Sequence, residues 1–295
     1  MHGWQETLKF FLIISGELIV LFIGISILVG LLREYVPAAK IQRVLGQGKR
    51  GSIVGAGFGA LTPFCSCSTI PLMVGLLNAG AAFGPTMSFL LASPLINPVV
   101  VGLFLIAFGW QITLVYFLFA FSLAVILGQM SEWGGLESSV RAVRITGGED
   151  DRPQGGPFKA RLKRASWSAW QEFLGFVPYM LIGVAIGAAI HGFMPQNWVA
   201  RAAGPDNPLA VPVAAVVGVP LYIRASTMVP IGLALIGKGM SLGAVMALII
   251  GGAGASIPEI SLLAKIFKPR LLIAFVLAIF LTATLVGLLF NAVFM

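Results

Sequence analysis

The amino-acid sequence predicts an all-α polytopic membrane protein built from two pseudo-symmetric, inverted repeats. Its composition, a series of long apolar stretches and motifs shared by the two halves support this prediction. Of the 295 residues, 58% are hydrophobic and 10% are charged, whereas a soluble domain has about 25% charged residues. A soluble globule of this size could not cover its surface with so few charges. The composition therefore excludes a soluble enzyme.

Six stretches are long and apolar enough to cross a bilayer, which takes about 20 residues. They cover residues 8–32, 85–107, 111–130, 173–194, 242–264 and 271–294. The first is expected to be a true span rather than a cleavable signal peptide, because it is too long and lacks a small-residue cleavage pattern.

Two further apolar stretches, 51–79 and 209–237, contain prolines on either side of a polar centre. Proline removes a backbone donor and disfavours helix at the preceding residue. We therefore expect each of these stretches to form two short helices joined by an extended piece.

The two halves share motifs at a spacing of about 158–160 residues, which indicates an internal duplication. The matching segments are 68–71 (STIP) with 226–230 (STMVP), 78–80 with 237–239, and 93–98 (SPLINP) with 254–259 (GASIPE). The predicted organisation is a first membrane repeat over 1–130, a flexible cytoplasmic linker over 131–171 that contains GGEDDRPQGG, and a second membrane repeat over 172–295.

The loop charges predict the topology. Loops 33–50, 131–171 and 265–270 hold 15 of the 19 lysines and arginines, and basic loops favour the cytoplasmic side. All three share that side only if 51–79 and 209–237 are re-entrant hairpins. Each half then has about three transmembrane helices and one hairpin, in opposite orientations, as in many transporters. The competing arrangement has eight full crossings and one basic loop outside.

The segment 62–71 (TPFCSCSTIP) places Cys65, Ser66, Cys67 and Ser68 between two prolines inside an apolar stretch. Non-helical backbone at membrane depth occurs only where protein or a water-filled cavity satisfies its polar groups, so we interpret this segment as a binding loop. In an extended chain, residues 65 and 67 point the same way, and two thiolates can hold a soft, thiophilic centre. The alternative is that these small residues only let helices approach closely, as expected for Gly55-x-x-x-Gly59 and Gly183-x-x-x-Gly187.

The matching break of the second half contains Arg224, Ser226 and Thr227, and Glu259 follows at the next break. A buried intramembrane arginine is costly and is a functional-site hypothesis by default. Arg224 and Glu259 either neutralise each other, or Arg224 attracts an anion or thiolate while Glu259 carries a coupling proton.

Two more polar side chains lie inside apolar stretches. Asn97, at a half-helix end, either contacts solute or satisfies freed carbonyls. Glu17, in the first span, either relays protons or bonds to a neighbouring helix.

The segments TPFCSCSTIPLMVGLLNAG (62–80) and GPTMSFLLASPLINP (84–98) resemble the predicted-permease family that includes the ArsP-type organoarsenical efflux permeases and the YraQ-type permeases. YIRASTMVPIGLALIGKGM (222–240) and GGAGASIPE (251–259) are more similar to the YraQ-type subgroup. In the arsenical branch, the resemblance implies export of trivalent organoarsenicals with membrane cysteines as ligands. Only Cys65 and Cys67 can carry that role here, since any third cysteine is absent.

The sequence thus predicts a bacterial inner-membrane permease, not an enzyme, for a small thiophilic, sulfur-containing or organometalloid solute. The rival interpretations are an intramembrane thiol–disulfide redox protein that uses Cys65 and Cys67, and a sensor that signals through the linker. Expected partners are the solute and the lipid bilayer, with a homodimer and a cytoplasmic thiol protein as further candidates; no cofactor, resident metal or nucleic acid is expected. The predicted solute-binding residues are Cys65, Ser66, Cys67, Ser68, Asn97, Arg224, Ser226 and Thr227, with Glu259 and Glu17 for proton coupling or ion pairing.

Overall fold

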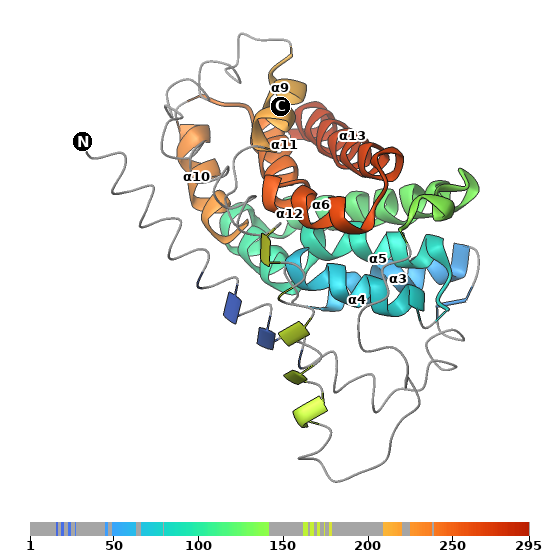
Figure 1. Cartoon of the computed structure of the whole chain (residues 1–295). Coiled ribbons are helices and arrows are strands. Elements are labelled where there is room, and N and C mark those ends of the chain that lie inside the picture. The colour runs from blue at the N-terminus through green and yellow to red at the C-terminus, as the bar shows by residue number, and fades with distance from the viewer. Residues whose placement is uncertain are drawn as a thin grey trace.

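A computed structural model describes residues 45–46, 49–62, 66–78, 80–141, 209–219, 225–237 and 239–294, with scattered positions between 16 and 27 and between 162 and 178 (Figure 1). Within these residues the regular structure is helical, apart from one isolated antiparallel bridge between Val140 and Phe267. The prediction of an all-α protein is therefore confirmed. The stretches 8–32 and 173–194 lie outside the described residues except at those scattered positions, and Glu17, Gly183 and Gly187 are not described.

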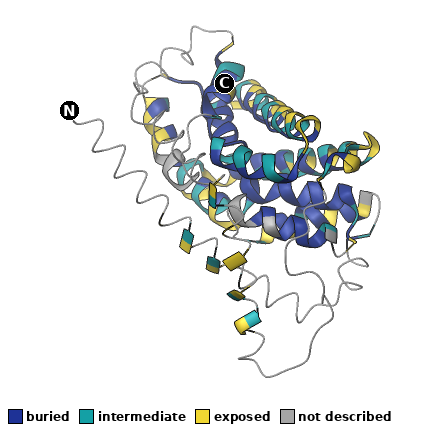
Figure 2. Cartoon of the chain, in the orientation of Figure 1, coloured by how far each residue is buried: buried dark blue, intermediate teal, exposed yellow. Residues whose placement is uncertain are grey.

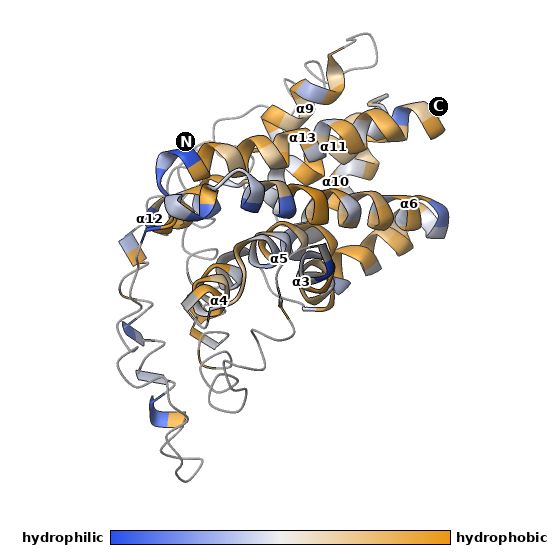
Figure 3. Cartoon of the chain, turned by 90° about the vertical axis from the view of Figure 1, so that its right-hand side faces the viewer, coloured by the Kyte–Doolittle hydropathy of each residue, from blue (hydrophilic) through white to orange (hydrophobic). Residues whose placement is uncertain are grey.

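The helices fall into two sets on either side of the uncertain middle of the chain. The first set is α3 (Lys49–Leu61), α4 (Ser66–Asn78), α5 (Phe83–Ile96), α6 (Pro98–Trp133) and the short 3-10 helix η1 (Leu136–Ser139). The second set is α9 (Ala210–Gly218), α10 (Ala225–Gly237), α11 (Leu242–Gly254), α12 (Ile257–Ile266) and α13 (Pro269–Phe294). Figures 1 and 3 show α3, α4 and α5 on one side of the molecule and α9, α11 and α13 on the other.

Both proline-interrupted stretches form two short helices, as the sequence predicts: α3 and α4 in the first half, α9 and α10 in the second. Helices α3 and α4 have 13 residues each, which at 1.5 Å per residue makes each about 20 Å long. That length is less than the bilayer core of about 30 Å. Neither helix can therefore cross a membrane alone.

Equivalent helices of the two halves begin at a constant spacing along the chain. The paired starts are Ser66 with Ala225, Phe83 with Leu242, and Pro98 with Ile257. The turns repeat as well: Gly80 (φ 79°) and Gly239 (φ 96°) both follow a helix in the left-handed conformation, which glycine adopts without a steric penalty. In each turn two backbone N–H groups bond back to the helix, Gly80 to Leu77 and Gly239 to Ile236 at 2.9 Å among them, as in a Schellman motif.

Helices α5 and α11 form the centre of the molecule. Every residue of α5 and nearly every residue of α11 is buried (Figure 2). Helices α3, α4 and α6 pack around α5. Helices α9, α10 and α13 pack around α11, and the two central helices contact each other. A helix that is apolar on all sides is typical of such a buried position.

Glycines allow α3 to lie directly against the backbone of α5. A β-carbon on Gly55 would lie 2.1 Å from the Pro85 carbonyl oxygen, and one on Gly59 would lie 2.9 Å from the Phe89 oxygen. The prediction that Gly55-x-x-x-Gly59 serves close helix packing is confirmed. Because the contacts advance together along both helices, α3 and α5 run in the same direction. Helix α4 joins the end of α3 to the start of α5, so it runs in the opposite direction to both.

Helix α6 consists of two arms that meet at Gly109, whose dihedral angles (φ 82°, ψ 171°) are not helical. The second arm returns along α5, since Gly128 lies against Ser88 and Glu132 against Gly84. The predicted span 85–107 therefore corresponds to α5 together with the first arm of α6, and the predicted span 111–130 corresponds to the second arm.

Among the described residues, Phe83–Trp133 and Pro269–Phe294 are long and apolar enough to cross a membrane. Helices α11 and α12, bent by 42°, are together long and apolar enough for either a third, broken span or a re-entrant loop. Leu114, Leu118, Leu277 and Leu281 on α6 and α13 are between 48% and 56% exposed. Figure 3 shows that the helices are mostly hydrophobic, with hydrophilic residues mainly near their ends. A lipid environment accounts for such exposed apolar faces.

The chain segment that follows α6 lies against the loop between α12 and α13. The Arg141 backbone N–H donates to the Ile266 carbonyl at 2.7 Å, and the Lys268 N–H donates to the Ser139 carbonyl at 2.8 Å. The start of segment 131–171 and the basic loop 265–270 therefore lie at the same end of the molecule.

Candidate solute-binding site at the helix breaks

Each half contains a break between two helices in the middle of an apolar span. In the first half α5 ends at Ile96 and Asn97 is extended (φ −66°, ψ 160°). In the second half Ser256 is extended (φ −64°, ψ 152°) before α12. Prolines at positions 98 and 258 fall in the first turn of the helix after each break, where the missing N–H group needs no partner.

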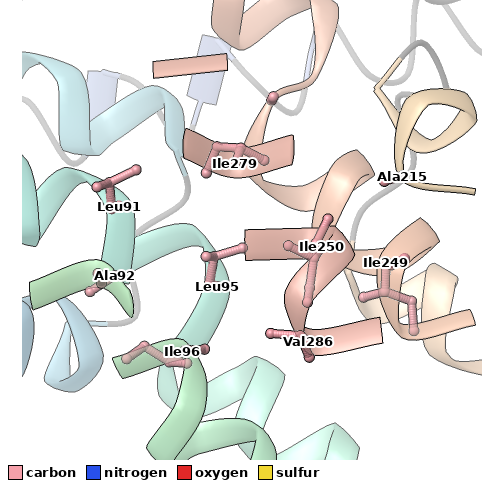
Figure 4. Close-up of a cluster of buried hydrophobic side chains, with 14 of the residues drawn as sticks. Leu91, Ala92, Leu95, Ile96, Ala215, Ile249, Ile250, Ile279 and Val286 are labelled. Atoms are coloured by element: carbon pink, nitrogen blue, oxygen red, sulfur yellow. The ribbon is translucent and has the colours of Figure 1, made fainter. Parts of the chain in front are cut away.

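The two breaks lie next to each other. A β-carbon on Gly254 would be 3.3 Å from a methyl group of Leu95, and these residues occupy equivalent positions, each two places before the extended residue of its break. Figure 4 shows Leu95 of α5 pointing toward Ile250 of α11. The structure thus brings the predicted second break of each half to a common centre.

Asn97 caps the helix that follows it. Its side-chain Oδ1 accepts a hydrogen bond from the Val100 N–H at 2.9 Å. The sequence left open a contact with solute or a bond to freed carbonyls, and this bond instead satisfies an N–H group at the start of a helix. It uses only the oxygen of the side-chain amide.

Tyr116 was not identified from the sequence, although it lies at the same break. Its hydroxyl donates to the Leu95 carbonyl at 2.8 Å, and its ring stacks on Phe104 at a centroid distance of 4.4 Å. The last four carbonyls of a helix have no partner within that helix. The hydroxyl of Tyr116 therefore satisfies one of the groups that the break exposes. The sequence feature that could have identified Tyr116 is that it is the single tyrosine in the apolar stretch 111–130.

Glu259 is the third residue of α12 and is 1% exposed. A carboxylate in the first turn of a helix is stabilised by the positive end of the helix dipole. Ser256-x-x-Glu259 matches the capping-box pattern, but the Ser256 side chain makes no capping bond within the described chain. The structure thus places a deeply buried acidic residue one turn from the centre where the breaks meet.

The cysteine segment is partly helical. Helix α4 begins at Ser66, so the extended conformation expected over 62–71 is wrong from Ser66 onward. Serine is favoured where a helix begins because its hydroxyl can accept a bond from an N–H group of the first turn. Ser226 and Thr227 likewise lie in the first turn of α10. Cys65 and Arg224 lie outside the described residues.

The helices that carry the predicted site residues pack crosswise between the halves. Helix α4, which contains Cys67, packs against α12, which contains Glu259. In the same way α10, with Ser226 and Thr227, packs against α6, which Asn97 caps. Among the described residues, no group of three or more His, Cys, Asp and Glu side chains could hold a metal ion.

Comparison with known proteins identifies the family of this chain. Residues 3–292 match a family, ArsP_1, that is described as predicted permeases. The chain belongs to this permease family.

Curated relatives of the permease cover most of its length. It is 24% identical over 291 residues to the UPF0718 protein MJ0584 of Methanocaldococcus jannaschii, with 79% of this chain and 80% of the relative covered. It is 23% identical to the UPF0718 protein YraQ of Escherichia coli, with 92% and 77% covered. It is 25% identical to the UPF0718 protein YcgR of Bacillus subtilis, with 90% of each chain covered. No solved structure matches the permease.

Equivalent residues of the permease also contact the starts of the two central helices, α5 and α11. The side-chain Oδ1 of Asn291 accepts from the Gly243 N–H at 2.8 Å at the start of α11. At the equivalent place in the first half, the Glu132 carboxylate lies against Gly84 at the start of α5, and the Gln129 side chain donates to it at 3.1 Å. Both halves therefore use the last turns of a long helix to complete the start of a central one.

Proposed function

We propose that this permease is a secondary transporter with two inverted repeats, in which a small thiophilic solute binds where the two helix breaks meet. The observation that carries the proposal is the contact between equivalent positions, Leu95 and Gly254. In a pseudo-twofold arrangement, residues at equivalent positions touch each other only near the symmetry axis. Broken helices at such an axis are the common binding arrangement of inverted-repeat transporters.

The chain directions support the inverted orientation. Helix α5 starts at the end of the molecule where α6 finishes, because Gly84 lies against Glu132. Helix α12 finishes at that same end, since Ile266 bonds to Arg141 shortly after α6. The broken span of the first half thus starts where the broken span of the second half finishes.

The hydrogen bonds between Arg141 and Ile266 and between Lys268 and Ser139 favour a re-entrant hairpin over a full crossing at 209–237. If 209–237 crossed the membrane, three crossings would separate segment 131–171 from loop 265–270, and they would lie on opposite sides. With hairpins, two crossings separate them and they share a side. Two direct backbone hydrogen bonds join them. The basic charge of both segments assigns that side to the cytoplasm.

The chemistry of the site favours a thiophilic solute. Cys65 and Cys67 supply thiols, which bind soft centres such as trivalent arsenic. Ser66, Ser68, Ser226 and Thr227 supply hydroxyls, Arg224 holds negative charge and Glu259 carries the coupling proton. Trivalent organoarsenicals are one such class of solute, and the resemblance to the ArsP-type permeases extends to these two cysteines.

Uptake into inside-out vesicles tests the proposal, with a trivalent methylarsenical as the probe and a pentavalent methylarsenical as the control solute. We expect saturable accumulation of the trivalent form, and its loss by at least about tenfold in a Cys65→Ser/Cys67→Ser variant, since the thiol ligands are gone. Unchanged transport in that variant would remove the thiols from the mechanism. A reversible Cys65–Cys67 disulfide without flux of any thiophilic solute would favour the redox interpretation.

A further inference from the structure

The short segment after α6 fastens the second half of the molecule to the first. It makes three hydrogen bonds to the loop between α12 and α13: Arg141 N–H to the Ile266 carbonyl at 2.7 Å, Lys268 N–H to the Ser139 carbonyl at 2.8 Å, and Lys268 Nζ to the Ser138 carbonyl at 2.8 Å. The first two enclose the antiparallel bridge between Val140 and Phe267. We refer to residues 138–141 as the strap.

Within the described residues, no backbone hydrogen bond joins the equivalent turn of the first half to another segment. By the constant spacing of equivalent helix starts, residues 266–268 correspond to 107–109. Of the equivalent residues, Ala107 and Phe108 are half-buried, whereas Ile266 and Phe267 are 0% and 1% exposed. The strap is thus a difference between the two halves within the described part of the chain.

The strap holds the end of α12 that faces the cytoplasm. Helix α12 carries Glu259 at its other end and packs on α4, which contains Cys67 in its first turn. Because α4 runs from the level of the breaks back to the level of Lys49 and packs on α12, the two helices lie side by side between the breaks and this end of the molecule. Moving α12 away from α4 requires the strap to release Ile266 and Lys268.

We propose that α12 is the cytoplasmic gate of the permease and that the strap is its latch. This inference rests on the proposed function, in which one half rocks against the other. Rocking separates segments from different halves by more than the roughly 3.5 Å that a hydrogen bond tolerates. The latched form is closed to the cytoplasm, and the equivalent gate at the opposite end, formed by the first arm of α6 against α10, has no latch among the described residues. The latch therefore stabilises the form that is closed to the cytoplasm.

The labelling rate of Cys67 tests the latch without any knowledge of the solute. The full-length Cys65→Ser protein in inside-out vesicles is treated with a membrane-impermeant maleimide, which reaches it from the cytoplasmic face. Arg141→Pro removes the N–H group that bonds Ile266, and we expect labelling to become about three- to tenfold faster. Lys268→Met removes only the Nζ bond and should give a smaller increase. Ser138→Ala keeps the backbone carbonyl that Lys268 uses, so its rate should stay at the parental value.

A disulfide provides the opposite test. Ser139→Cys/Lys268→Cys joins facing residues of the strap and the loop, and its oxidation should slow the labelling of Cys67 at least about fivefold, with recovery after reduction. Equal labelling rates in Arg141→Pro, Lys268→Met and the oxidised pair would overturn the latch. The methylarsenical vesicle assay separates the two proposals. If the strap variants change the labelling rate of Cys67 but no methylarsenical is transported, the proposed solute is refuted and the gate is kept. If the methylarsenical is transported but the strap variants leave the labelling rate unchanged, the gate is refuted and the solute is kept.

Discussion

At the residue scale, prolines and polar residues within apolar stretches predicted the breaks correctly, whereas the hydrogen bond of Tyr116 at the break joins residues far apart along the chain. Asn97 and Glu259 were identified because polar residues at proline-containing breaks are conspicuous in an apolar sequence. The bond of Asn97 is local, because its acceptor serves Val100 three positions later, and an asparagine followed by proline is a helix-start pattern that predicts such a cap. Tyr116 escaped notice because the carbonyl it satisfies, that of Leu95, lies 21 positions away and is exposed only by the break.

Removal of the Tyr116 hydroxyl tests the contribution of this bond to the break. Tyr116→Phe keeps the stacked ring, and the equivalent residue in α13 is already Phe275. It leaves the buried Leu95 carbonyl without its donor, so we expect a loss of about 1–3 kcal/mol in the free energy of unfolding. Unfolding in detergent by a denaturant titration measures this loss.

The matched control is Ser122→Ala, since the Ser122 hydroxyl is exposed and bonds only to Leu118 within the same helix. Its stability should change by less than about 0.5 kcal/mol. Equal stabilities for Tyr116→Phe and the wild type would show that the Leu95 carbonyl finds another donor.

At the element scale, the sequence patterns located the helices well and their pairing less well. The prolines predicted that 51–79 and 209–237 each form two helices, and both do. The extended geometry assumed for Cys67 failed because α4 already begins at Ser66: residues with short polar side chains start a helix as readily as they form a loop. The crosswise packing of α4 on α12 was not predicted, since it depends on the placement of the two halves.

Glycine packing between α3 and α5 can be tested with two substitutions in one helix. Gly55→Ala places a methyl group against the Pro85 carbonyl, which forces the two backbones apart and should cost about 1–3 kcal/mol. Gly57→Ala meets nothing within 4 Å and should be neutral or stabilising by up to about 1 kcal/mol, because alanine favours helix. Thermal unfolding of both variants measures the difference. If Gly55→Ala were as stable as Gly57→Ala, the close approach of α3 and α5 would not contribute to stability.

At the scale of the whole molecule, the repeat spacing was the most informative property of the sequence. The spacing of the shared motifs agrees with the constant spacing of the equivalent helix starts. The loop charges predict that segment 131–171 and loop 265–270 share a side of the membrane, and in the structure the start of this segment bonds to that loop. The strap had no sequence signal, because its bonds join backbone groups of two segments that lie far apart along the chain.

The topology itself gives the last prediction. Single cysteines replace Ser138, Arg270 and Gln111, three exposed residues, in a background in which Cys65 and Cys67 are serine. A membrane-impermeant maleimide should label Ser138→Cys and Arg270→Cys only in inside-out vesicles, and Gln111→Cys only in intact cells with a permeable outer membrane. Residue 111 follows the turn at Gly109, at the far end of α6 from Trp133, and the basic loops favour the cytoplasm. Eight full crossings instead require Ser138→Cys and Arg270→Cys to be labelled from opposite sides, so this pair of variants decides whether 209–237 is a hairpin or a span.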